Sequence, residues 1–132
     1  MINPLIVFGG PHALVFPKKI LQEQKQIDIM VVGEGEYTIL EIAEFVKNKR
    51  SFKNIKGIYF RDDKGNIVKT SPAETIKDLD KLPFPAYHLV DLKKYVPLPH
   101  HYKRLPAINV VTARGCSWGQ CTFCFESIRL GH

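Results

Sequence analysis

The residues that could do chemistry are three cysteines, Cys116, Cys121 and Cys124, which lie inside nine consecutive positions. The chain has no other cysteine. A disulfide framework favours an even number of cysteines, so it would leave one over. A redox pair needs only Cys121 and Cys124, with two residues between them, and would leave Cys116 without a role.

Metal binding provides two further uses for clustered thiols. A zinc site takes four ligands, so a histidine or another group must join three thiolates. His101 lies fifteen residues before Cys116, next to His100, and His132 ends the chain, so none of these is a favoured fourth ligand. An iron–sulfur cluster is bound by thiolates that lie close together, and three of them leave one iron of a four-iron cluster open.

The run of residues 114–124, RGCSWGQCTFC, resembles the cluster loop of the radical S-adenosylmethionine (SAM) enzymes. That family usually has the pattern C-x3-C-x2-C with an aromatic residue before the third cysteine. Phe123 takes the aromatic position. Four residues separate Cys116 from Cys121, and this longer gap resembles a variant among members that carry a cobalamin domain.

The resemblance implies a role for each residue of this loop. Cys116, Cys121 and Cys124 would each bind one iron of a [4Fe–4S] cluster, and the open iron would bind SAM. An electron from a reductant such as flavodoxin or ferredoxin would then cleave the sulfonium bond of SAM and yield a 5′-deoxyadenosyl radical. Phe123 would pack beside the cluster and the adenosyl group. Trp118 would either shield the loop or act as a plain hydrophobic anchor.

The residues before the cysteines predict a strand that positions them. Residues 107–113, AINVVTA, form a short, β-branched apolar run, which is typical of a buried strand. In (β/α) barrels, sites are built on the loops that follow the carboxyl ends of strands. We therefore expect residues 106–132 to be the first strand and cluster loop of a radical SAM (β/α) barrel.

The first part of the chain predicts a doubly wound α/β fold. The apolar runs at residues 5–8 and 27–32 are typical of buried parallel strands, and a helix is expected after each of them. In the second helix, an apolar stripe of Ile39, Ile42, Ala43 and Val46 is expected to face the core. Because an open sheet of this type has more than two strands, residues 1–54 are expected to be the C-terminal part of a Rossmann-like domain, in a fragment of a larger enzyme.

The loops after the two expected strands are rich in glycine. Paired glycines allow a tight turn and the close approach of a ligand, and a plain turn is the simpler interpretation. Residues 7–12, VFGGPH, resemble the Gly-Gly segment of the cobalamin-binding domain type, which implies that Gly9 and Gly10 contact the nucleotide tail of cobalamin. His12 does not match that family's cobalt-binding motif and is expected at the surface. Residues 33–36, GEGE, are expected to place carboxylates at a helix N-terminus.

The middle of the chain, residues 55–105, predicts a β-hairpin and then a Pro-rich linker. Two β-branched runs, residues 57–61 and 66–70, flank a turn of sequence DDKG. Five prolines follow between residues 71 and 102, where they disfavour helix. Residues 78–87 resemble the connector between the cobalamin domain and the barrel of that family.

Composition sets wider bounds on function. The chain has 132 residues and a formal net charge of +6, and its basic residues are spread along the chain, which favours a solvated surface over nucleic-acid binding. No apolar run approaches the ~18–20 residues of a membrane helix, and clustered free thiols favour the cytoplasm. The substrate, a small molecule or a peptide, is not indicated. The alternative function is a non-catalytic zinc-binding or metal-free α/β module.

Overall fold

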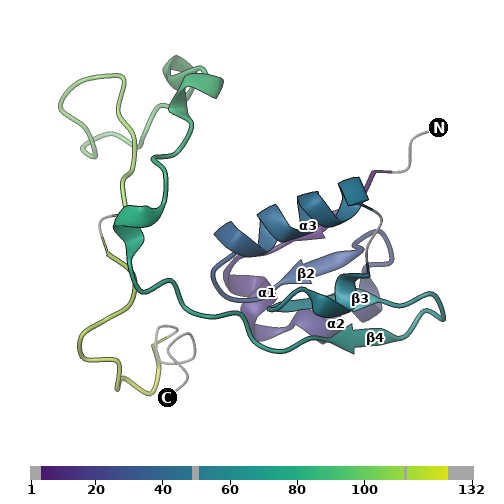
Figure 1. Ribbon diagram of the computed structural model, residues 1–132. Coiled ribbons are helices and arrows are strands. Elements are labelled where there is room, and N and C mark those ends of the chain that lie inside the picture. The colour runs from purple at the N-terminus through teal and green to yellow at the C-terminus, as the bar shows by residue number, and fades with distance from the viewer. Residues whose placement is uncertain (1–3, 49–50, 112, 125–132) are drawn as a thin grey trace. The chain divides into compact units, whose positions relative to one another are not determined.

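The computed structural model of the chain describes residues 4–48, 51–111 and 113–124 (Figure 1). The chain divides into two compact units, with the boundary after Lys77. Every strand and α-helix of the described residues lies in the first unit, and the described part of the second unit contains only short 3-10 turns.

A four-stranded sheet of mixed direction forms the centre of the first unit (Figure 1). Its strands are β1 (Val7–Phe8), β2 (Ile29–Val31), β3 (Ile58–Arg61) and β4 (Ile67–Lys69), in the spatial order β1-β2-β3-β4. β1 runs parallel to β2, whereas β3 runs antiparallel to both β2 and β4. The α/β class and the parallel pairing of the first two strands were both predicted.

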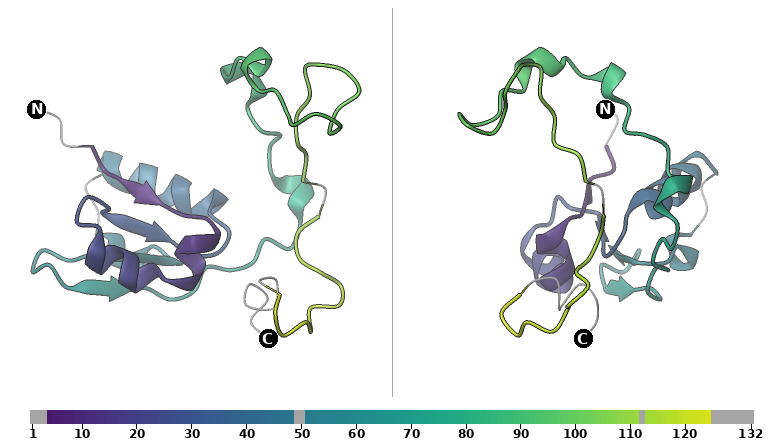
Figure 2. Two further views of the ribbon diagram at one scale, coloured as in Figure 1. Left: turned by 180° about the vertical axis from the view of Figure 1, so that it is seen from behind. Right: turned by 90° about the vertical axis from the view of Figure 1, so that its left-hand side faces the viewer.

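Helices cover both faces of the sheet (Figure 2). They are α1 (Pro11–Val15), α2 (Pro17–Glu23) and α3 (Glu36–Asn48). The side chains of β2 explain why helices pack on both faces of the sheet, because successive side chains of a strand point to opposite faces. Ile29 and Val31 pack in one core cluster with Ile42 of α3, and Met30 packs in a second cluster with Leu21 of α2. All three β2 residues are buried, which fits an interior strand with helices packed on both faces.

β1 differs from the doubly buried strand that was predicted for residues 5–8. It spans only two residues and lies at one edge of the sheet. Leu5, Ile6 and Phe8 remain 38%, 41% and 39% exposed, because no described strand lies on the outer side of β1. A short additional helix, α1, precedes α2: Pro11 occupies its first turn, a position where the fixed φ of proline is favourable.

The core face of α3 differs from the predicted stripe. Ile42 is only 2% exposed, as expected, but Ile39 and Val46 are 45% and 53% exposed. Thr38 and Phe45 take their place: Thr38 is buried, and Phe45 packs against Phe52 with ring centroids 4.2 Å apart. The apolar periodicity identified the helix correctly, but contacts with the sheet and with Phe52 determine which face points inward.

β3 and β4 form the predicted hairpin. One oxygen of Asp62 accepts hydrogen bonds from the backbone nitrogens of Lys64 (3.0 Å) and Asn66 (2.7 Å), and Gly65 takes a φ of +80°. The prediction grouped this hairpin with the linker in residues 55–105. In the structure β3 pairs with β2, so the hairpin completes the sheet of the first unit.

The second unit has little regular structure in its described residues. Its 3-10 turns are Leu79–Lys81, Tyr87–Leu89 and Leu92–Lys94. The predicted strand at residues 107–113 is not formed where the structure describes it; Thr112 lies outside the described residues. Val110 and Val111 are 65% and 78% exposed, and no described strand of this unit is available to pair with them. None of the described helices in either unit is long and apolar enough to cross a bilayer.

Candidate cofactor-binding edge and cysteine loop

Two glycine-rich loops meet at one edge of the first unit. β1 and β2 are parallel, so their carboxyl ends lie at the same edge, and the loops at residues 9–10 and 33–36 follow these ends. A Cβ on Gly9 would lie 3.6 Å from the Val31 carbonyl oxygen, and one on Gly35 would lie 3.4 Å from Val31 Cγ1. Both loops therefore approach the end of β2 and lie next to each other.

Gly10 and Gly33 leave this edge open. Their φ angles are +92° and +96°, a region that favours glycine, and among the described residues a Cβ built on either glycine would meet no heavy atom within 4 Å beyond those of its chain neighbours. Open α/β sheets bind ligands at the carboxyl ends of their parallel strands. The edge formed by residues 9–10 and 33–36 thus has the backbone and the free space for a bound cofactor.

His12 lies beside this edge, at the start of α1. It is exposed, and its ring contacts that of Phe16 edge-on, with centroids 5.8 Å apart. The surface position was predicted.

Glu34 makes a contact that sequence reasoning missed. Its Oε2 accepts a hydrogen bond from the backbone nitrogen of Ile76 over 2.5 Å, although the two residues are 42 positions apart. Glu36, by contrast, lies in the first turn of α3, as expected. No local sequence signal pairs Glu34 with an amide so distant in the chain.

The structure joins two of the three cysteines in one turn of the second unit. The Cys124 backbone nitrogen donates to the Cys121 carbonyl oxygen over 3.1 Å. Cys116 is exposed, and Cys121 and Cys124 are partly buried. Among the described residues, no three His, Cys, Asp or Glu side chains are grouped closely enough to hold a metal ion. Three thiols suit an iron–sulfur cluster chemically, but the loop must draw them together to bind one.

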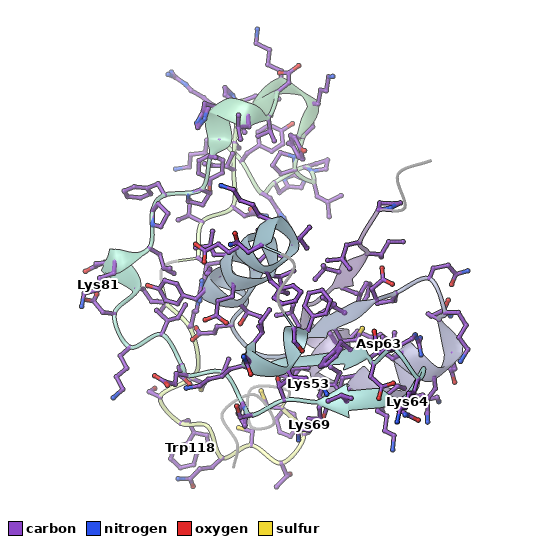
Figure 3. The ribbon with its side chains drawn as sticks, turned by 45° about the vertical axis from the view of Figure 1, so that its right-hand side comes forward. Lys53, Asp63, Lys64, Lys69, Lys81 and Trp118 are labelled. Carbon is purple, nitrogen blue, oxygen red and sulfur yellow. The ribbon has the colours of Figure 1, made fainter. Side chains whose placement is uncertain are left out.

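The aromatic residues of the cysteine loop point away from any core. Phe123 is 92% exposed and Trp118 is 65% exposed. Figure 3 labels Trp118, whose side chain extends from the loop. Gly119, next to Trp118, is buried and takes a φ of +61°, while Gly115 takes +91°. These two glycines turn the loop on either side of Ser117 and Trp118. His132 lies outside the described residues.

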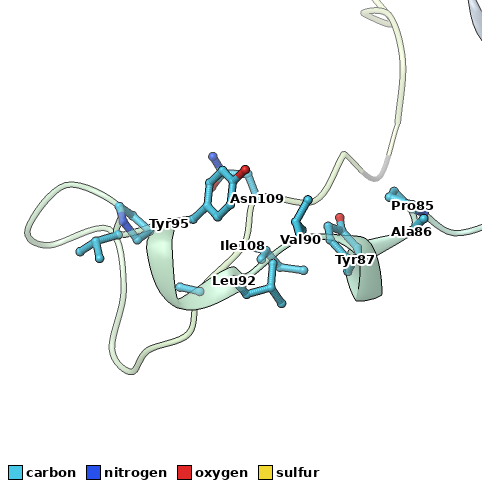
Figure 4. A pocket seen from close by; sticks show the side chains of 11 residues that line it. Pro85, Ala86, Tyr87, Val90, Leu92, Tyr95, Ile108 and Asn109 are labelled. Atoms are coloured by element: carbon cyan, nitrogen blue, oxygen red, sulfur yellow. The ribbon is translucent and has the colours of Figure 1, made fainter.

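The second unit also contains an apolar hollow of about 560 Å³ that sequence reasoning missed (Figure 4). Two tyrosines, Tyr87 and Tyr95, line it together with Val90 and Ile108, and Asn109 contributes an amide. The lining residues come from the linker and from the run that was predicted as a strand. Because these segments are far apart in sequence, periodicity could not have revealed the hollow.

Comparison with known proteins was made for the whole chain. No protein-family model matches it. It is 33% identical to an uncharacterized methyltransferase from Pyrococcus horikoshii, over 98% of this chain and 27% of that protein. It is 36% identical to the anaerobic magnesium-protoporphyrin IX monomethyl ester cyclase of Synechocystis, over 92% of this chain and 23% of that protein. The chain thus spans about a quarter of the length of these curated relatives.

A solved structure is also similar to part of the chain. It is the cobalamin-dependent S-adenosylmethionine radical enzyme OxsB with aqua-cobalamin and S-adenosylmethionine bound. The similarity covers 54% of this chain and 10% of that one, at 18% identity and a TM-score of 0.47. Its sequence relatives, which are methyltransferases and cyclases, are members of the cobalamin-dependent radical SAM enzyme family, the family that the cysteine loop predicted.

Proposed function

We propose that the chain forms the part of a radical SAM enzyme that holds the [4Fe–4S] cluster and contributes to a cobalamin site. The observation that carries the proposal is the spacing of three cysteines, Cys116, Cys121 and Cys124, in a chain that resembles family members over almost its whole length. With its reduced cluster and SAM bound, such a site supplies a 5′-deoxyadenosyl radical. The reaction proposed for the whole enzyme is a cobalamin-dependent methyl transfer or a related radical reaction.

The chain's own residues have defined tasks in this proposal. The three thiols must lose their protons to become ligands, so cluster binding requires the loop to bring thiolates together. Phe123 offers an uncovered aromatic face beside two of these ligands, available to pack against the cluster and the adenosyl group. Gly9 and Gly10 keep the edge of the first unit free of side chains, so that the nucleotide tail of cobalamin can approach the backbone.

The finer fold assignment belongs to the same proposal. The first unit is the C-terminal part of a Rossmann-like, cobalamin-binding domain, which the exposed outer edge of β1 supports. Residues 106–132 are the start of the barrel, supported by the exposed apolar side chains of Val110 and Val111. These side chains gain a partner if the run joins a sheet. The proposed compartment is the cytoplasm, where thiols stay reduced and a flavodoxin or ferredoxin can supply the electron.

The test is anaerobic reconstitution of the chain with iron and sulfide, followed by visible and EPR spectroscopy with and without SAM. We expect a charge-transfer band at roughly 400 nm. We also expect an EPR signal of the reduced protein that changes when SAM is added, as for a cluster with one open iron. Cys121→Ser should remove the band, whereas Thr122→Ala, at the neighbouring position, should keep it. A colourless protein with stoichiometric zinc, or one without metal, would overturn the cluster assignment for this chain and favour the non-catalytic module.

A further inference from the structure

A short segment after β4 lies along the edge that carries the glycine-rich loops. We call this segment, residues 71–76, the strap. The Gly57 nitrogen donates to the Ser71 carbonyl oxygen over 2.7 Å, and Lys56 Nζ lies 2.7 Å from Glu74 Oε1. At the end of the strap, the Ile76 nitrogen donates to Glu34. The strap is therefore attached to the first unit at three points along its length.

Gly57 shows that the strap is closely fitted. Its φ is +73°, and a Cβ built on it would lie only 2.6 Å from Ala73 Cβ and 3.2 Å from the Val32 carbonyl oxygen. The Val32 nitrogen in turn donates to the Gly57 carbonyl oxygen over 2.8 Å. Gly57 thus lies between the end of β2 and the strap, where a larger side chain would separate them.

Of the two carboxylates that attach the strap to the first unit, Glu34 forms the stronger contact. The Lys56–Glu74 pair is 54% and 86% exposed, and exposed ion pairs contribute little. Glu34 is partly buried, and its short hydrogen bond to Ile76 is charge-assisted, which makes it one of the stronger kinds. Glu34 also belongs to the loop at residues 33–36, in which a Cβ built on Gly33 would meet open space.

We propose that Glu34 is a positioning residue that latches the strap to the loop at residues 33–36 and so fixes the point where the linker leaves the first unit. The loop at residues 33–36 would then form part of the cofactor-binding edge and also hold the start of the linker in place. A ligand that orders this loop in its latched conformation strengthens the latch, and the latch strengthens the ligand's binding by the same factor, because coupling between two sites is reciprocal. This second statement rests on the proposed cobalamin site, whereas the latch itself does not.

The latch is tested by hydrogen exchange of the Ile76 amide in the full chain, followed by NMR. We expect Glu34→Ala to speed this exchange by about tenfold or more, since the amide loses an ionised acceptor. Glu34→Gln should restore part of the protection, because the amide oxygen can still accept. Glu44→Ala, at an exposed position of α3, is the matched control. The Val32 and Thr70 amides, which bond within the unit, should keep their wild-type rates in every variant.

Two results of the exchange experiment would contradict the latch. Unchanged exchange at Ile76 in Glu34→Ala would overturn the latch. Equal acceleration of Ile76, Val32 and Thr70 would also overturn it, because it would show that Glu34 supports the whole unit rather than the strap.

The coupling is tested by adding hydroxocobalamin to the wild-type chain and to Glu34→Ala. We expect binding, seen as a change in the visible spectrum, to slow exchange at Ile76 in the wild type only. Binding without a change at Ile76 would overturn the coupling and leave the proposed function standing. Absence of binding would count against both the coupling and the cobalamin site, while the ligand-free comparison would still decide the latch.

Discussion

The two units of the chain distribute apolar side chains in opposite ways. In the first unit, two core clusters fill both faces of the sheet, and Leu21, Ile29 and Met30 are completely buried. In the described part of the second unit, Leu98 and Phe84 are 70% and 94% exposed, and no apolar side chain of the cysteine loop belongs to a core cluster. We infer that the first unit is stabilised by its own buried apolar core. The second unit must instead be stabilised by contacts that cover its exposed apolar side chains.

The largest expected effect separates the two units directly. Leu21→Ala removes a fully buried side chain between α2 and the sheet and should lower the free energy of unfolding by about 2–5 kcal/mol. Leu98→Ala makes the same chemical change at an exposed site and should stay within about 0.5 kcal/mol. Urea titration followed by circular dichroism measures both. Equal losses in the two variants would mean that the second unit has a core of its own.

A second matched pair tests the fit of the strap inside the first unit. Gly57 and Gly65 both take a positive φ, so alanine at either site costs about 1–2 kcal/mol in backbone strain. Only at Gly57 does the added Cβ meet Ala73, which should cost about 1–3 kcal/mol more. Thermal unfolding of Gly57→Ala and Gly65→Ala compares the two. If both variants melt together, the strap yields easily and the first unit is looser at that edge than the structure indicates.

Arg61 provides a smaller test of how the first unit ties its layers together. Its guanidinium donates to the carbonyl oxygens of Leu21 and Gln24 and so satisfies the C-terminal end of α2 from β3. Arg61→Met should cost about 1.5 kcal/mol, the value of a hydrogen bond to a charged group. Lys64→Met, at the exposed hairpin turn, is the control and should be near neutral. A neutral Arg61→Met would show that α2 is held by its apolar contacts alone.

The smallest expected effect is a dependence of stability on pH that is confined to the first unit. Backbone hydrogen bonding from Asn66 lowers the pKa of Asp62, and hydrogen bonding with Lys56 lowers that of Glu74. Because both pKa values are lower in the folded state, the stability they confer is present above their unfolded values and is lost as the pH falls through the folded ones.

Melting temperatures between about pH 6 and pH 3 measure this effect. We expect Asp62→Asn and Glu74→Gln to flatten the slope at the acidic end, with Asp63→Asn as an exposed control at the same turn. A slope that survives in both variants would place the acid-sensitive groups elsewhere.

Much of the first unit could be predicted because its signals are local. The apolar run around Ile29 predicts a strand, Gly65 after Asp62 predicts a hairpin turn, and both elements formed. The phase of α3 could not be predicted, since choosing Phe45 over Val46 for the core depends on Phe52, which follows the helix. The predicted strand ending at Ala113 had a local signal but no described partner strand, and strands depend on pairing.

The candidate site also has parts that local sequence predicts and parts that it does not. The types and spacing of Cys116, Cys121 and Cys124 were sufficient to predict the enzyme family, and the glycines at residues 9–10 were sufficient to predict an open loop after a strand. The contact between Glu34 and Ile76 was not predictable, because nothing in either local sequence indicates the other. The arrangement of the three thiols as cluster ligands remains a prediction; the structure shows a turn in which the Cys124 nitrogen donates to the Cys121 carbonyl oxygen.

The pairing order of the sheet has a further consequence for how the protein folds. β3 and β4 pair Arg61 with Ile67 across one short turn, whereas β1 and β2 pair Val7 with Ile29 across two helices. Closing a longer loop costs more entropy, so local pairs form early and distant parallel pairs form late. We therefore expect the hairpin to be the first part of this sheet to form and β1 to join last, although β1 precedes the hairpin in the chain.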